Sequence, residues 1–221
     1  MEARNTVTKF GAARAIASIV GVLAGLGGMT HGVGEILQGN VAPESIFINS
    51  WATGPIATSL GGEPAMTIVP SMMATGILNI ILTLILIVWA AAFVQKKQGG
   101  AVLALLSVLM LLVGGGFAPP LIGILAGIAG TQINSPHHWW RKHVPAIVLG
   151  TLAGLWLPVF GVTVINGVFL VIGSVTLVYF LGLNNPDLFV YSFFLAIITV
   201  ILSILTGVAY DLQAGEPAKV K

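Results

Sequence analysis

The sequence has very little charge and no cysteine, and both scarcities narrow the class of protein. Only 7% of its 221 residues are charged, whereas 57% are hydrophobic. A soluble domain carries roughly 25% charged residues, so this chain cannot cover a globular surface with groups that water solvates well. The absence of cysteine excludes disulfides, thiolate nucleophiles and cysteine-bound metals.

Several sequence motifs are also missing, and their absence argues against an enzyme. The chain has no glycine-rich phosphate loop, no H-E-x-x-H and no G-x-S-x-G. The apolar segments lack the paired carboxylates of an intramembrane protease, and the last one has no lysine for a retinal Schiff base. The net charge of +2 comes from short, separate basic groups, which excludes a nucleic-acid surface. We predict no catalytic residue, metal or cofactor.

Long apolar runs make up most of the sequence. In hydrocarbon every backbone N–H and C=O must be satisfied internally, which leaves only helices or a closed barrel. The runs are continuous and lack the ten-residue alternation of barrel strands, so they predict helices. The expected fold is therefore all-α, a polytopic helical membrane protein whose single membrane domain covers residues 1–221 in a lipid bilayer.

The apolar runs divide into about seven membrane segments. A crossing needs about 20 apolar residues, and Gly-Pro stretches such as "GGGFAPP" at 114–120 interrupt helices. The first run follows basic residues as a signal peptide does, but it continues to Leu37 and is predicted to be a retained span. The alternative is six crossings with 119–133 re-entrant. The expected segments are 13–38, 69–95, 101–117, 119–133, 146–163, 167–183 and 188–209.

Basic residues in the short connections predict the orientation. Cytoplasmic loops carry an excess of Lys and Arg. If 101–133 crosses twice, seven basic residues lie on the side of the N-terminus, which is therefore predicted to be cytoplasmic. The long polar connection 39–68 is then outside, and the tail with Lys219 and Lys221 also falls outside. The seven basic residues are Arg4, Lys9, Arg14, Lys96, Lys97, Arg141 and Lys142.

Small and uncharged polar residues predict how the helices pack. Glycines at spacings of 4, 3 and 4 in the first segment share one helix face, where a neighbouring helix can approach closely. That face serves either the chain's own helices or a homo- or hetero-oligomer. Asn79 and Asn166 are expected to form interhelical hydrogen bonds. The hydroxyls of the last segment share one helix face, and they either line a hydrated path or bond to a neighbouring helix or to their own backbone. The glycines are Gly21, Gly25, Gly28 and Gly32.

Two ionisable residues near the end of the first segment are the main candidates for chemistry. His31 and Glu35 are four residues apart, so they are neighbours on a helix. His31 lies about 27 Å along a helix that begins near Ala13, close to the outer boundary of the hydrocarbon core. The pair either holds the helix end at the interface or binds a proton or cation at the mouth of a pathway, together with Glu63.

The motif "HHWWRKH" at 137–143 resembles a metal cluster only at first sight. Its histidines lack the i, i+4 spacing of a helical metal pair, and no carboxylate is near in sequence. Trp139 and Trp140 beside Arg141 and Lys142 are instead typical of a membrane interface. We expect this segment to contact anionic lipid headgroups.

Two functions remain open from the sequence. The interrupted segment at 114–120, the glycine faces and the polar mouth favour a small-solute or ion transporter or channel. The alternative is a structural or accessory membrane subunit that packs against partner helices. Polar groups that converge between the spans would favour transport, whereas glycine faces turned outward would favour the accessory role.

Overall fold

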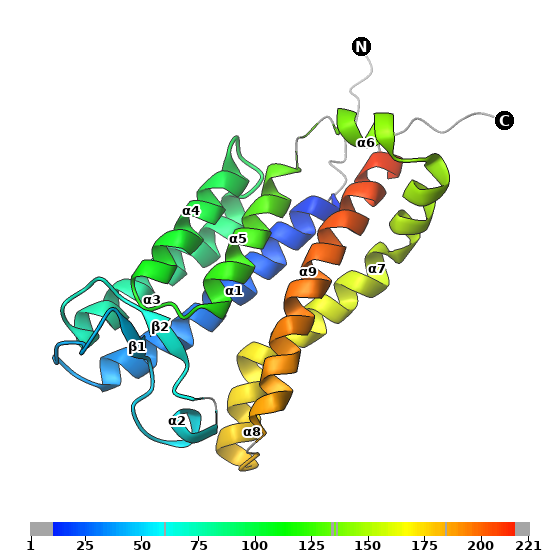
Figure 1. The fold of residues 1–221 in the computed structure, drawn as a ribbon. Helices are drawn as coiled ribbons and strands as arrows, with labels where there is room; N and C mark the ends of the chain where they lie inside the picture. Colours follow the sequence, from blue (N-terminus) through cyan, green and yellow to red (C-terminus); the bar gives the residue numbers. More distant parts are fainter. Residues whose placement is uncertain (1–10, 60, 134, 136, 184, 215–221) are drawn as a thin grey trace.

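The architecture is that of a helical bundle in a computed structural model, which describes residues 11–59, 61–133, 135, 137–183 and 185–214 (Figure 1). Within these residues, four helical stretches are long and apolar enough to cross a membrane. They are α1 (Ala12–Leu37), α3 with its π-helical end η1 (Met72–Val88 and Trp89–Phe93), α7 to α8 (Ala146–Phe180) and α9 (Pro186–Ala214). Two shorter apolar helices are α4 (Gly99–Leu112) and α5 (Ala118–Thr131). The predicted all-α class is confirmed.

The helices form two groups that lie side by side (Figure 1). Helices α1, α3, α4 and α5 pack into one group, in which α1 contacts both α3 and α5. Helices α7 to α9 form a long antiparallel hairpin that contacts α1 and α5 mainly through α9. Figure 1 shows this hairpin diverging from α1 at the α8 end.

The predicted interruption between the third and fourth segments is confirmed. Helix α4 ends at Leu112, and α5 begins at Ala118 with Pro119 and Pro120 in its first turn, where a missing N–H costs nothing. Backbone hydrogen bonds from Ile68 to Leu112 and from Gly114 to Met66 place this turn beside the long outer connection. The other end of α5 returns to the start of α4, so α5 runs the full length of α4.

The structure does not confirm seven segments. The residues expected to form two helices, 146–163 and 167–183, form one continuous helix through α7 (Ala146–Val168), the π-helical turn η2 (Phe169–Gly173) and α8 (Ser174–Phe180). Pro158 lies inside this helix without ending it. Proline removes one N–H from the helical hydrogen bonds, and in lipid no water is present to bind the backbone groups that a helix break would expose.

With four long and two shorter apolar helices in place of seven segments, both ends of the described chain lie at the same end of the bundle (Figure 1). The carboxylate of Asp211 on α9 accepts hydrogen bonds from the first N–H groups of α1, at 2.7 Å from Ala12 and 2.9 Å from Ala13. All described Lys and Arg residues lie here, and we call this the basic end. They are Arg14, Lys96, Lys97, Arg141 and Lys142. Arg4, Lys9, Lys219 and Lys221 lie outside the described residues.

The opposite end carries most of the described carboxylates, and we call it the acidic end. It contains Glu35, Glu44, Glu63 and Asp187. Here the connection between α1 and α3 folds into an antiparallel β-hairpin, β1 (Phe47–Asn49) with β2 (Pro64–Met66), around the short helix α2 (Pro55–Ser59). Because α2 contacts α8, the connection reaches across from one helix group to the other.

The glycine stripe of α1 faces the chain's own helices. A Cβ at Gly21 would meet Ala90 of η1, one at Gly25 would meet Ile87 of α3, and one at Gly28 would meet Met110 of α4. The closest approach is at Gly32, whose carbonyl oxygen touches the position that a Cβ on Gly76 would take. This face is therefore covered within the chain.

Two buried asparagines link helices as predicted. Asn79 Nδ2 on α3 donates to the carbonyl of Gly28 at 2.9 Å, and Asn166 Nδ2 on α7 donates to the carbonyl of Ser192 at 2.8 Å. Among the hydroxyls of α9, Ser203 meets Thr163 at 2.9 Å and the threonines bond to their own preceding turn. These bonds hold the helix pairs α1–α3 and α7–α9 in register.

Candidate functional site

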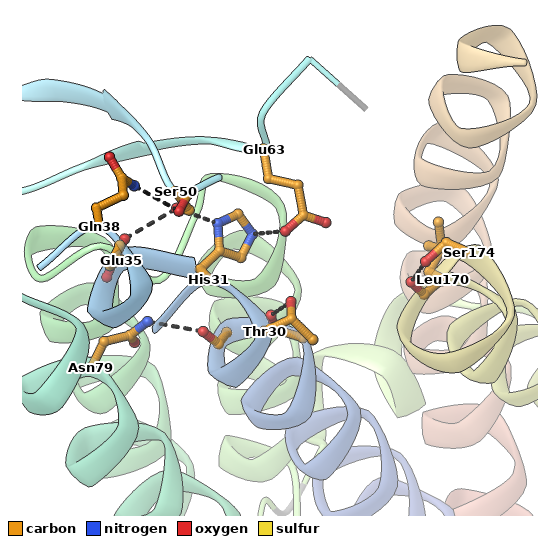
Figure 2. Close-up of polar contacts among 11 residues, drawn as sticks. Thr30, His31, Glu35, Gln38, Ser50, Glu63, Asn79, Leu170 and Ser174 are labelled. Carbon is orange, nitrogen blue, oxygen red and sulfur yellow. Dashed lines mark hydrogen bonds and ion pairs between the residues drawn. The ribbon is translucent and has the colours of Figure 1, made fainter. Parts of the chain in front are cut away.

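The site is built around His31 and Glu35 near the end of α1, together with a serine from the outer connection. His31 Nδ1 lies 2.9 Å from Ser50 Oγ, and Ser50 Oγ donates to Glu35 Oε1 at 3.0 Å. Glu35 and Ser50 are fully buried, and His31 is nearly so. Figure 2 shows Ser50 between the two α1 side chains. The i, i+4 pair is thus bridged by a residue from the outer connection.

The hydrogen bond that Ser50 donates to Glu35 favours one tautomer of His31. Ser50 has one hydroxyl hydrogen, which it donates to Glu35, so its lone pairs accept from the Nδ1–H of His31. In a neutral imidazole the other nitrogen, Nε2, then carries a lone pair. That lone pair faces away from Ser50, toward Glu63 (Figure 2).

Glu63 reaches the site from the outer connection, just before β2. Its backbone has φ of 51°, in the left-handed region, between Gly62 and the start of the strand. Its Oε2 lies 3.8 Å from His31 Nε2. That oxygen is buried and completes no hydrogen bond within the described residues, although the whole side chain is 20% exposed.

The glycines of the turn between α4 and α5 press against this network. Gly114 and Gly116 both have positive φ, of 89° and 76°. A Cβ on Gly114 would strike the Glu35 carboxylate, and one on Gly116 would strike the His31 ring. The turn can therefore approach the polar groups only because these positions carry no side chain.

Two cavities meet at His31 and Glu63. The inner cavity, of about 170 Å³, lies between α1, α5, η2, α8 and α9, and extends along α1 from His31 back to Val20. That distance is about 16 Å at the rise of an α-helix. The outer cavity, of about 410 Å³, is bounded by the outer connection and the starts of α5 and α9. Residues that line both are His31, Glu63, Ala118, Leu170, Ser174 and Phe193.

The inner cavity is almost entirely apolar below its mouth and is closed toward the basic end. Thr30, Thr163 and Ser174 supply the only hydroxyls among its described lining residues. Beyond it, Gly207 of α9 packs directly on Ile16 and Ala12 of α1. The π-helical turn η2 forms part of the wall, and such turns often mark functional sites.

The structure separates the other predicted site residues from this network. Trp139, Trp140, Arg141 and Lys142 lie on α6 (His138–His143) at the basic end, where Trp139 is 63% exposed and stacks on His143. Their contact with lipid headgroups stays a prediction. The four glycines of the stripe pack against neighbouring helices and do not line the inner cavity. The glycine of α1 that does line it is Gly27, on the adjacent face.

Sequence patterns did not identify Ser50 or Ser174 as site residues. Ser50 lies in the long connection, where no spacing rule relates it to the first helix. Ser174 belongs to a run expected to contain a helix break. Comparisons with protein-family models, with curated proteins and with solved structures found no match to this chain.

We expect Glu63 to make the folded state less stable as pH rises. Burial raises the pKa of Glu63 to about 7, and the nearby Trp51 side chain offsets only part of this. The unfolded chain loses this proton near pH 4.5, so the folded state loses stability between pH 4.5 and about 7. The full loss is about 3 kcal/mol, at 1.36 kcal/mol per pKa unit.

The measurement compares apparent melting temperatures of wild type and Glu63→Gln in detergent from pH 4.5 to 8.5. The melting temperature of the variant, relative to that of wild type, should rise with pH up to about pH 7 and stay constant above it. His31, which faces residue 63, and Glu35, which is linked to His31 through Ser50, are present in both proteins, so the difference reports on Glu63. Glu44→Gln, an exposed change in the same connection, should track wild type throughout. A constant gap between wild type and Glu63→Gln over the whole range would refute the burial effect.

Proposed function

We propose that this chain is a membrane transport protein that carries a small solute through the inner cavity. The observation that carries this proposal is that a polar network at the acidic end of the bundle borders an apolar cavity that extends between the helices. Ionisable groups inside membrane proteins usually mark substrate or ion pathways. Here His31 and Glu63 line both cavities where the outer one meets the inner one, and Glu35 is linked to His31 through Ser50.

The proposed orientation places the basic end in the cytoplasm. All described Lys and Arg residues lie at that end, as expected of cytoplasmic loops. The outer cavity then opens outward, and the seam of α9 on α1 closes the inward side. Opening inward would require the α7–α9 hairpin to tilt against the α1 group.

The accessory-subunit alternative has lost its main support. It rested on a glycine face free to bind a partner helix, and the stripe on α1 is covered by α3, η1 and α4. The same spacing is explained by close packing within one chain. A cavity with converging polar groups has no evident role in a purely structural subunit.

Single cysteines placed along the pathway test the proposal, because the natural chain contains none. We expect Ser174→Cys to react with a membrane-impermeant thiol reagent from the outside. Thr206→Cys, buried on α9 near the closed seam, should react from the cytoplasmic side when that seam opens. Ser107→Cys, fully buried between α4 and α5, is the matched control and should not react from either side.

Each pattern of labelling decides the question. Reaction of Ser174→Cys from outside and Thr206→Cys from inside supports alternating access. Reaction of Ser174→Cys alone indicates a closed-ended binding pocket and overturns transport. Lack of reaction at both positions, with a folded protein by size-exclusion chromatography, overturns any role for the cavity.

A further inference from the structure

The mouth of the inner cavity presents two hydrogen-bond acceptors to the same space. In the tautomer that donates Nδ1–H to Ser50, His31 Nε2 is an acceptor, and Glu63 Oε2 is a buried carboxyl oxygen without a hydrogen bond among the described residues. Their separation of 3.8 Å is too long for a direct hydrogen bond. Two acceptors at this spacing suit one cationic group with several N–H donors.

The charges around the mouth favour a cation. Neither cavity is lined by a Lys or Arg among the described residues, and those that the structure describes lie at the basic end. The carboxyl that lines both cavities is that of Glu63, which would repel an anion when ionised. A neutral solute supplies no counter-charge, so the buried carboxyl of Glu63 would be partly protonated beside it at neutral pH, whereas a cation pairs with the ionised form.

The ligand set argues against a metal cation. Calcium takes six to eight oxygen ligands, and magnesium demands octahedral geometry with several waters. The described residues offer one unpaired carboxylate oxygen and one imidazole nitrogen at this point. An ammonium group, in contrast, needs only two or three acceptors.

The inner cavity below the mouth suits an apolar body of modest size. Its walls include Leu23, Ile122, Val171 and Phe193, and its volume is about 170 Å³. An apolar cavity of roughly 150 Å³ is large enough to hold benzene. A solute with one ring or a short branched chain would therefore fill it, with its polar end at Glu63.

We infer that the solute is a protonated amine with a small apolar body, whose ammonium group binds between Glu63 and His31 while the body occupies the inner cavity. This inference rests on the proposed function, since it names the class of solute that the pathway takes. Glu63 supplies the charge, and Ser50 holds His31 in the orientation that makes Nε2 an acceptor.

Benzylammonium is a suitable probe, and benzyl alcohol is its neutral counterpart of almost equal shape. We expect calorimetry on the protein in lipid nanodiscs to show binding of benzylammonium. Glu63→Gln should weaken it by about tenfold or more, because a desolvated carboxylate partner is lost. The affinity for benzyl alcohol should be low and unchanged, and Glu44→Gln should bind benzylammonium as wild type does. Benzylammonium should also slow the labelling of Ser174→Cys.

The outcomes separate this inference from the proposed function. If Ser174→Cys is labelled and benzyl alcohol binds as tightly as benzylammonium, the amine class is overturned while the pathway stands. Equal binding of benzylammonium to wild type and Glu63→Gln overturns the assigned charge partner. If Ser174→Cys resists labelling altogether, the cavity is closed to solutes and both proposals fall.

Discussion

Gly76→Leu is expected to prevent α1 and α3 from packing and to yield no folded protein. A Cβ at Gly76 would strike the carbonyl oxygen of Gly32 and would lie 2.8 Å from Ile36 Cγ1 and 2.9 Å from Ile36 N. Two of these three atoms belong to the backbone of α1, so the clash cannot be relieved by a side-chain rotation. The helices would have to separate, and they would lose the Asn79 bond to Gly28 as well.

The smaller change Gly76→Ala tests the same contact in a protein that still folds. We expect it to cost about 3 kcal/mol, the upper part of the range for overpacked sites. Gly154→Ala on α7 is the matched control, because a Cβ there meets nothing within 4 Å. Alanine is the better helix former by about 1 kcal/mol, so the control should be as stable as wild type or slightly more stable.

Thermal unfolding in detergent, together with the yield of monodisperse protein, measures both effects. An equal loss in Gly76→Ala and Gly154→Ala would show that glycine content matters and close packing does not. A stable, monodisperse Gly76→Leu would contradict the close approach of α1 and α3 itself.

The fold was largely predictable because membrane helices follow from apolar length and from chain breakers. Gly114 to Pro120 ended one helix and began the next, since three glycines and two prolines leave few alternatives. The break expected between 163 and 167 does not occur, and the helix also continues through Pro158. Proline breaks helices when water can bind the freed backbone groups, but within a membrane helix the cost of leaving the helix is greater.

The site was predictable only in part, because local spacing gives no information about residues that are far apart in the sequence. His31 and Glu35 were placed together by the i, i+4 rule, and Glu63 was suggested by its charge in the outer connection. Ser50 had no such signal. It reaches the site only because the connection folds into the β1–β2 hairpin and returns over the end of α1.

Ser50→Ala is expected to have the second largest effect, because one hydroxyl serves two buried groups. Its removal takes the donor from Glu35 Oε1 and the acceptor from the His31 Nδ1–H. Glu35 Oε2 already completes no hydrogen bond among the described residues, so the carboxyl would be left unsatisfied at both oxygens. Each unsatisfied buried group costs about 1 to 3 kcal/mol, and two are created here. Ser45→Ala removes an exposed hydroxyl in the same connection. Its two bonds to the Phe47 backbone can be replaced by water, so this control should cost much less stability.

The same variant separates the roles of the two histidine nitrogens. In wild type, ¹⁵N chemical shifts of a histidine-labelled sample should show His31 as the neutral Nδ1–H form, because Ser50 accepts that proton. Without Ser50 the proton is free to move to Nε2, where it would face Glu63 and turn an acceptor into a donor. Benzylammonium binding should then fall even though Glu63 is intact. Unchanged tautomer and unchanged binding in a folded Ser50→Ala protein would show that His31 does not depend on this serine, and the acceptor assigned to Nε2 would lose its basis.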